Sequence, residues 1–401
     1  MSKSSTGQAT VVEFRSAIQQ LVRSRVQEAI QIIVEEELTE ALGCGPYERS
    51  GSRRGYRHGT YRRQITTAQG PQDLEVPRGR LVRPDGSTEE FRSAIVPRYQ
   101  RRTEEVDEAI LGAYLAGANS RRIRKALAPL LGQDNLSKSA ISRVVGRLKA
   151  LFATWCERDL SHQRYPVLYL DGFYLKVRLA RRVVSVPVLA VLGVAQDGRK
   201  VLVALRLAAS EAGAHWKSLI EDLEQRGLRA PQLIIADGHK GLAKARTVWP
   251  GAKVQRCTKH KWENLVKHCP AHARAEMKRD WDPIVKAANG AKARAAYNDF
   301  VRKWSRLVPA VARSLEEAGL TLLTFYEFPK PMWKTLRTTN PLENLNREFR
   351  RRTKTQGSFS TEAAGVTLLW GLIAFGQIRM RRIDGYQHLY TIIDHQEEAA
   401  A

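Results

Sequence analysis

The stretch RTTNPLENLNREFRRRTK, residues 337–354, contains the helix around which the fold of this chain is organised. It predicts a helix that begins abruptly, because Asn340 is a good N-cap and Pro341 suits the first helical position. Apolar side chains then recur at helical spacing, so one face of the helix is expected to be buried in a core. That face consists of Leu342, Leu345 and Phe349.

The other side of this helix combines one carboxylate with a row of cations that suits a phosphodiester. Glu343 comes first, and the cations follow it at helical spacing. Glu343 has two interpretations, because it stands three residues after Asn340, where a capping-box glutamate reaches back to the N-cap amide. A catalytic role requires partners elsewhere in the chain. The cations expected to contact DNA are Arg347, Arg350, Arg351 and Lys354.

Composition limits the classes of function. The chain has 401 residues, with 66 Lys plus Arg against 41 Asp plus Glu and a formal charge of +25, so a polyanion is the expected partner. No apolar run reaches the roughly 18 residues that a membrane span needs. The four cysteines, Cys44, Cys156, Cys257 and Cys269, are too few and too scattered for a disulfide framework. Without a signal-peptide pattern, a reducing cytoplasm is expected.

The first hundred residues predict a long helix followed by small β-ribbons. After about ten loose residues, residues 11–42 carry apolar side chains at mostly helical intervals. Residues 47–97 are rich in Gly, Arg, Thr and Tyr, with short alternating pieces typical of strands. The arginines of this segment suit contacts with a phosphate backbone, or they form a solvated basic arm. The candidates are Arg53, Arg54 and Arg57.

Residues 104–151 return to a helical period and predict three short helices, the third opening at Ser137 or Ser139. Such a unit suits a helix-turn-helix, in which early residues of the third helix meet the major groove. A plain helical bundle with a basic rim is the alternative, because the second turn is longer than usual. The positions expected to contact DNA are Lys138, Ser139, Ser142 and Arg143.

From Tyr165 the pattern changes to strands separated by a helix. Asp197-Gly198 lies between two apolar runs and predicts a hairpin turn, and Asp171-Gly172 is a candidate for another turn. The last strand ends in Asp237, which gives an α/β arrangement with ligands at the carboxyl ends of strands. The expected strands are residues 167–170, 173–179, 183–194, 200–207 and 232–236.

Three carboxylates emerge from this layout, with Asp171 and Asp237 at strand ends and Glu343 on a helix. Asp237 and Glu343 are 106 positions apart (343 minus 237), which predicts a substantial helical insertion between them. If the carboxylates converge, they can hold two Mg²⁺ ions roughly 3.5 to 4 Å apart. Mg²⁺ prefers oxygen ligands. From the residues alone, this remains one triplet among 41 acidic residues.

Several blocks of sequence stand in a distinctive order. They are RGYRHGTY (54–61), GANSRRI (117–123), LDGFY (170–174), RGL (226–228), DGHKGL (237–242), QRCTKHK (255–261), RTTNPLE (337–343) and GSF (357–359). In residues, order and spacing, these blocks resemble those of the Mutator-type transposases of bacterial insertion sequences. The resemblance covers most of the chain.

The resemblance implies an α/β fold, in which a ribonuclease-H-like catalytic core, a mixed sheet with helices, is interrupted by an all-helical insertion. Helical DNA-binding and small β-rich regions are expected to precede this core. The resemblance implies Asp171, Asp237 and Glu343 as catalytic residues and metal ligands for two Mg²⁺ ions, with Mn²⁺ as a substitute. The implied reaction cleaves DNA at terminal inverted repeats, frees a 3′-hydroxyl and transfers it to target DNA. A homodimer is expected, because two ends must be held together.

These expectations divide the chain into six regions. They are 1–45, an N-terminal helical region; 46–100, a basic β-rich segment; 101–158, a helix-turn-helix region; 159–262, the first part of the core; 263–335, the helical insertion; and 336–401, the returning helix of Glu343 with C-terminal helices. The predicted location is the bacterial cytoplasm in association with the nucleoid, with no membrane contact. Two rival functions are a DNA-binding regulator without catalysis and a nuclease without strand transfer.

Cys257 and His260 match the Cys-x-x-His block of the family. With His268 and Cys269 nearby they could form a zinc site, which requires four ligands. The favoured alternative is a buried Cys beside a His that positions DNA or the scissile phosphate, so structural zinc is not expected. His239 is a further candidate for a supporting role at the site.

Overall fold

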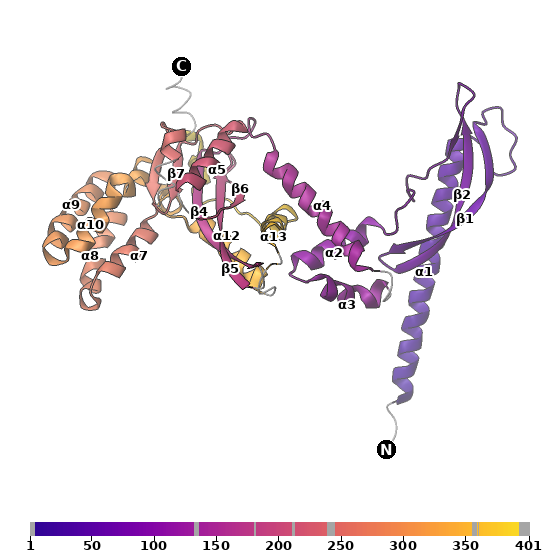
Figure 1. The fold of residues 1–401 in the computed structure, drawn as a ribbon, viewed down its shortest axis with the longest axis horizontal. Helices are drawn as coiled ribbons and strands as arrows, with labels where there is room; N and C mark the ends of the chain where they lie inside the picture. Colours follow the sequence, from indigo (N-terminus) through magenta and orange to yellow (C-terminus); the bar gives the residue numbers. More distant parts are fainter. Residues whose placement is uncertain are drawn as a thin grey trace. The chain divides into compact units, whose positions relative to one another are not determined.

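The computed structural model describes residues 5–131, 136–179, 182–210, 213–238, 245–354, 359 and 361–392. Over these ranges the chain is a mixed α/β protein with two sheets and many helices (Figure 1). It divides into two compact units, residues 1–147 and residues 148–401. The regions expected from the sequence are a finer division, which stays a prediction. None of the described helices is long and apolar enough to cross a membrane.

The first unit begins with a long helix that packs on a β-ribbon. Helix α1 starts at Ser5, earlier than the expected residue 11. Val34, Leu38 and Leu42, which follow one another at intervals of four residues, are buried near the ribbon. The elements are α1 (Ser5–Leu42), β1 (Gly55–Thr67), β2 (Gly70–Val82) and β3 (Thr88–Glu90), and the three strands pair antiparallel in the order β1-β2-β3.

Three helices follow the β-ribbon, which confirms the helical expectation for this segment. They are α2 (Glu104–Leu115), α3 (Ser120–Leu131) and α4 (Lys138–Glu157). Each contributes an isoleucine to one shared core, through Ile110, Ile123 and Ile141. The expected turn at residues 132–135 lies outside the described residues.

The second unit contains a five-stranded sheet with the order β6-β5-β4-β7-β8. Its strands are β4 (Val167–Leu179), β5 (Arg182–Val194), β6 (Lys200–Leu207), β7 (Leu233–Ala236) and β8 (Lys253–Arg256). Strands β4, β5 and β6 pair antiparallel, whereas β7 and β8 join them in parallel. The hairpin at Asp197-Gly198 is confirmed, with Gly198 at a φ of 83°. The candidate turn at Asp171-Gly172 was wrong, because both residues pair with β5 in the middle of β4.

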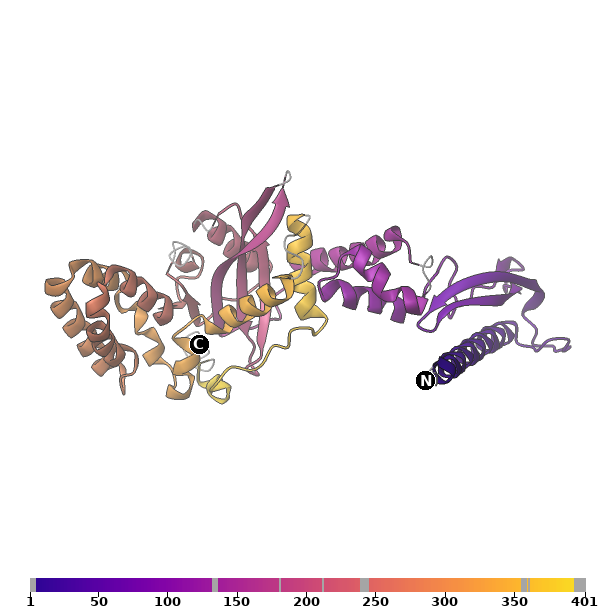
Figure 2. The same cartoon turned by 90° about the horizontal axis from the view of Figure 1, so that it is seen from below.

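The two faces of β4 pack against different parts of the chain. Leu168 and Leu170 join a core that also includes helix α5 (Gly213–Gln225). On the alternate positions, Tyr169 donates a hydrogen bond to the carbonyl of Thr335, and Phe173 packs on Phe349 of helix α12 (Asn340–Thr353). Figure 2 shows α12 lying across this side of the sheet. Asp171 stands two residues from both Tyr169 and Phe173 and therefore shares their face, which α12 covers.

A helical segment with its own core separates β8 from α12. Its helices are α7 (Thr258–His268), α8 (Arg274–Val285), α9 (Gly290–Leu307) and α10 (Pro309–Ala318), followed by short turns and α11 (Trp333–Leu336). Trp281, Phe300 and Trp304 pack together at its centre. The buried amide of Gln255 ties the segment to β8, because it donates to the carbonyl of Leu322 and accepts from the amide of Phe325. Helix α13 (Glu362–Ala374) returns to contact the sheet.

Candidate active site

The first two carboxylates of the site come from neighbouring strands: Asp171 lies in β4, and Asp237 directly follows β7. In the parallel pair β4 and β7, Leu170 lies opposite Ala236, so Asp171 and Asp237 follow at the same level of the sheet. Asp171 was expected at a strand end. The structure corrects this, because β4 continues beyond its short partner β7 while it remains paired to β5. Burial raises the pKa of Asp171 to about 7, with the charge of His260 acting against this and the charges of Asp237 and Glu343 adding to it.

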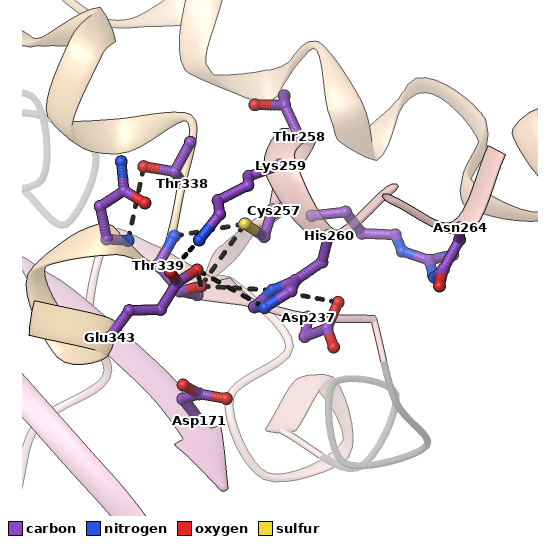
Figure 3. Close-up of polar contacts among 12 residues, drawn as sticks. Asp171, Asp237, Cys257, Thr258, Lys259, His260, Asn264, Thr338, Thr339 and Glu343 are labelled. Carbon is purple, nitrogen blue, oxygen red and sulfur yellow. Dashed lines mark hydrogen bonds and ion pairs between the residues drawn. The ribbon is translucent and has the colours of Figure 1, made fainter. Parts of the chain in front are cut away.

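Helix α12 brings Glu343 to the same place in its first turn. The N-cap is Thr339, one residue before the expected Asn340. The amide of Asn340 is satisfied by the Thr338 hydroxyl at 3.4 Å, so it does not need the capping carboxylate. The Glu343 side chain instead contacts the Lys259 ammonium and lies 3.5 Å from Nε2 of His260 (Figure 3). The side chain of Glu343 therefore points toward the other site residues.

Helix α7 supplies the cations that separate these carboxylates. The amide of Cys257 donates to the carbonyl of Ala236, which fixes the start of α7 next to Asp237. His260 then lies between two carboxylates, with Nδ1 at 3.2 Å from Asp237 and Nε2 at 3.5 Å from Glu343. Burial acts to lower the pKa of His260, but its contact with Cys257 and the two carboxylate charges raise it to about 9.

The side chain of Thr339 contacts several of these groups. It is fully buried, and its hydroxyl lies 3.4 Å from Cys257 Sγ, from His260 Nδ1 and from Glu343 Oε1. Its amide also donates to Cys257 Sγ at 3.4 Å. Figure 3 shows this threonine at the centre of the polar contacts, with Asp171 facing the group from β4.

Three of these neighbours were not singled out from the sequence: Lys259, Thr339 and Asn346. Asn346 is a buried polar residue on the otherwise apolar face of α12, and its amide donates to Asp171 at 3.3 Å. Its position three residues after Glu343 was the available signal, because residues at that spacing are neighbours on a helix. Lys259 and Thr339 stand inside the sequence blocks around Cys257 and Glu343.

Cys257, His260 and Glu343 also form a possible metal-binding group, with one ligand atom from each lying within 4.8 Å of the others. No other such group of three occurs among the residues that the structure describes. The expected neighbour Cys269 lies elsewhere, in the helical core, with Sγ near the carbonyl of Pro270. His239 lies outside the described residues.

The predicted cations of α12 lie on its exposed side. Arg347 contacts the side chain of Asn344, and Arg351 pairs with Glu348 at 2.6 Å. The buried side of the helix is formed by Leu342, Leu345 and Phe349, as expected. All four of the predicted cations are exposed: Arg347, Arg350, Arg351 and Lys354.

The predicted DNA contacts of the first unit fall into two groups. Lys138, Ser139, Ser142 and Arg143 are exposed at the start of α4. The three predicted arginines at or beside the β-ribbon, Arg53, Arg54 and Arg57, each make a contact within the unit, and their role in DNA binding stays a prediction. Arg57 pairs with Glu35 of α1 at 2.5 Å, and Arg54 donates to the carbonyl of Glu40 at 2.6 Å. Arg53 donates to the carbonyl of Gly55 at 2.7 Å.

Comparison with known proteins identifies the family. A family model described as "Transposase, Mutator family" matches residues 2–375. The transposase for insertion sequence element IS905 of Lactococcus lactis is 33% identical over 350 residues, which cover 86% of each chain. The transposase for IS406 of Burkholderia multivorans is 33% identical over 354 residues, 86% of this chain and 89% of that protein. Its counterpart for IS1081 of Mycobacterium tuberculosis is 30% identical over 370 residues, 92% and 88% of the two chains. The chain therefore belongs to the Mutator family of transposases.

Proposed function

We propose that this protein is a DNA transposase that binds the terminal inverted repeats of an insertion sequence. It cleaves the DNA to free a 3′-hydroxyl, and this hydroxyl then attacks a phosphodiester of the target DNA. The end of the element is thereby joined to the target strand, and a 3′-hydroxyl of the target is released. The family supports a transposase, and the relatives are named as transposases for insertion sequence elements. The proposal adds the DNA substrate, the reaction steps and the residues that perform them.

The observation that carries the proposal is the convergence of three carboxylates from distant parts of the chain. Asp171 comes from β4, Asp237 follows β7, and Glu343 comes from α12. Burial raises the pKa of Asp171, and the charges of Asp237 and Glu343 add to this effect. Three half-buried carboxylates in one site are costly unless cations accompany them. Such a group suits the binding of divalent ions and phosphate.

The donor set fits hard divalent cations. Carboxylate oxygens are the ligands that Mg²⁺ and Mn²⁺ prefer, and we assign Asp171, Asp237 and Glu343 as the residues that hold two of them. When bound, such ions supply an activated hydroxyl and stabilise the leaving oxygen of a phosphodiester. Around this set, Asn346 orients Asp171, whereas His260 and Lys259 hold Glu343. A zinc site at Cys257 is not proposed, because Sγ already accepts hydrogen bonds from Thr339.

We further propose a ribonuclease-H-like core for the second unit. The order β6-β5-β4-β7-β8, with antiparallel and parallel halves, supports such a mixed sheet. In this view α7 to α11 form the insertion that separates Asp237 from Glu343. The start of α4 binds DNA, the exposed cations of α12 hold the cleaved strand, and two copies of the chain hold the two ends.

The test is cleavage of a duplex that carries the inverted repeats flanking the reading frame, in the presence of Mg²⁺ or Mn²⁺. Asp171→Ala and Glu343→Gln are expected to abolish cleavage and to leave DNA binding intact. Glu348→Gln is the matched control, because it removes a carboxylate from the exposed side of the same helix. If either site variant cuts as fast as the unaltered protein, the assignment is wrong. Products with hydrolysed ends alone would indicate a nuclease, and binding without any cleavage would indicate a regulator.

A further inference from the structure

A cavity of about 720 Å³ opens in the first unit beside the β-ribbon and the start of α4. We call it the arginine groove, and it is lined by residues of β1 and β2, by residues 90–102 and by the first turns of α4. Its lining includes seven arginines and a single carboxylate, Glu90. The exposed members used below are Arg92, Arg98, Arg101 and Arg143, together with Tyr99.

Residues 90–102 form one wall, which hydrogen bonds hold in place. Glu37 of α1 accepts from the Ser93 hydroxyl and the Ala94 amide, both at 2.5 Å. Arg63 of β1 donates to the carbonyls of Val96 and Gln100. The amide of Thr66 donates to the carbonyl of Arg101 at 3.0 Å. This wall is therefore preorganised, which lowers the entropy lost when a ligand binds.

Helix α4, whose first turns also line the groove, is tied to the same segment by Asp107 at the start of α2. Its carboxylate pairs with Arg102 at 2.8 Å and also contacts Arg147 of α4. This arrangement places the first turns of α4, including Arg143, along the groove. Arg63 and Arg102 thus serve the structure, whereas other arginines present their charge to the groove.

The presented charges are largely uncompensated. Glu90 pairs with Arg78 at 3.2 Å and lies 4.0 Å from Arg98. In the part of the chain that the structure describes, no ion pair to Arg92, Arg101 or Arg143 is found. A concave surface lined by one sign of charge concentrates oppositely charged ligands.

Tyr99 marks the rim of the groove. It has a φ of 72°, a left-handed conformation that is costly for a residue with a side chain, and it is 83% exposed. The guanidinium of Arg98 lies over its ring, 5.3 Å from the centroid. The segment therefore presents an aromatic ring and a cation to solvent side by side. Both the exposure of an apolar ring and the left-handed backbone conformation cost free energy.

We propose that the arginine groove binds the phosphodiester backbone of duplex DNA through Arg92, Arg101 and Arg143. This inference rests on the proposed function and deepens it, because it names the surface that holds the DNA. It also changes the role expected for Arg143, from reading bases to contacting phosphate. Lys138, Ser139 and Ser142 remain the candidates for base contacts at the start of α4.

The test measures binding of a fluorescently labelled random-sequence duplex to the full chain between about 50 and 200 mM salt. The triple variant Arg92→Gln, Arg101→Gln and Arg143→Gln is expected to lower the slope of log affinity against log salt by about 2.7, three times 0.9. Affinity at physiological salt should fall on the order of 100-fold. Replacing the same residues by Lys should keep the slope, because a phosphate contact needs a positive charge.

The matched control removes three arginines outside the groove, by Arg25→Gln, Arg62→Gln and Arg83→Gln. Each of these already pairs with a carboxylate, so the slope should change little. A thermal unfolding curve for each variant checks that it is folded. If the groove and control variants reduce the slope equally, net charge alone explains the binding and the proposal is overturned.

Two further outcomes separate this proposal from the proposed function. Arg143→Gln should weaken binding to random and repeat-bearing duplexes by the same factor; a loss restricted to the repeat would show base reading and overturn the backbone role. An unaltered protein that shows the predicted groove dependence but cleaves no DNA would contradict the function and leave the groove standing. An active protein whose groove variants bind normally would contradict the groove alone.

Discussion

The side-chain amide of Asn346 donates a hydrogen bond to the carboxylate of Asp171 at 3.3 Å, from α12 to the middle of β4. This contact aligns the helix that carries Glu343 with the strand that carries Asp171. Asn346 is buried, and its other side-chain atom, Oδ1, has no hydrogen-bond partner among the described residues. A buried polar group in this position is best explained by its effect on Asp171.

Replacing Asn346 by alanine should therefore impair cleavage more than folding. We expect the cleavage rate to fall about 10- to 100-fold, which is typical when a partner of a metal ligand is removed. The free energy of unfolding should fall by about 1 kcal/mol, because one hydrogen bond is lost. Asn344→Ala is the control on the exposed side of α12, and it should cleave normally. Equal cleavage rates for both variants would show that Asn346 does not support cleavage through Asp171.

Thr339 and its neighbour Thr338 offer a matched pair. Thr339→Val removes the hydroxyl that contacts Cys257, His260 and Glu343, so the cleavage rate should fall about 10-fold or more. Thr338→Val removes the acceptor for the Asn340 amide and should cost about 1 kcal/mol of stability with little effect on cleavage. Chemical denaturation and cleavage assays measure the two effects. Equal loss of cleavage in both variants would contradict the role of Thr339.

Glu317 predicts a pH dependence in the helical segment. It pairs with Lys261 at 2.7 Å and with Arg256 at 2.9 Å. Burial acts to raise its pKa, but these two partners hold the pKa below its usual value of 4.5. A carboxyl whose pKa is lowered by folding contributes stability above its unfolded pKa, and that stability is lost as the pH falls through the folded pKa.

Glu317→Gln should therefore reduce the free energy of unfolding by about 1 to 2 kcal/mol at pH 7, since buried Lys261 loses its partner while Glu317 itself is largely exposed. The difference from the unaltered protein should shrink when both are unfolded by urea well below the usual carboxyl pKa. Glu316→Gln removes the same charge from the neighbouring position and should have little effect at either pH. A difference for Glu317→Gln that persists in acid would exclude the ion pairs as its cause.

Tyr99 and Tyr47 both adopt a positive φ, 72° and 60°, and both are exposed. Replacing either by glycine should raise the free energy of unfolding by about 1 kcal/mol, because relief of the left-handed conformation outweighs the added freedom of the unfolded chain. Only Tyr99→Gly should weaken binding to duplex DNA, since Tyr47 does not line the arginine groove. If Tyr47→Gly weakened binding to duplex DNA to the same extent, Tyr99 would have no specific role in binding DNA at the arginine groove.

Local sequence patterns predicted the helices and strands of this fold well. They predicted the surroundings of individual residues less well. The apolar spacing of Leu342, Leu345 and Phe349 correctly gave the buried face of α12. The Asp171-Gly172 pair resembled a turn, but pairing along the whole of β5 keeps it extended. Local propensity is overridden here by long-range pairing, which a single sequence does not display.

At the candidate site too, local sequence did not give the direction of a side chain. Spacing placed Glu343 where a capping residue belongs, and only the distant residues Lys259 and His260 turn its side chain toward the other carboxylates. Among the arginines near the ribbon, a count of charges also cannot reveal that Arg57 pairs with Glu35 of α1. The roles of all these residues in catalysis and DNA binding stay predictions.

The catalytic role of Asp171, Asp237 and Glu343 is tested by the joining of a pre-cut element end to target DNA in Mg²⁺. Asp237→Asn is expected to abolish joining while it binds the DNA end with unchanged affinity. Asp197→Asn, at the hairpin between β5 and β6, removes a carboxylate away from the site and should join as the unaltered protein does. Joining by Asp237→Asn at the unaltered rate would contradict the assignment of Asp171, Asp237 and Glu343 as the catalytic carboxylates.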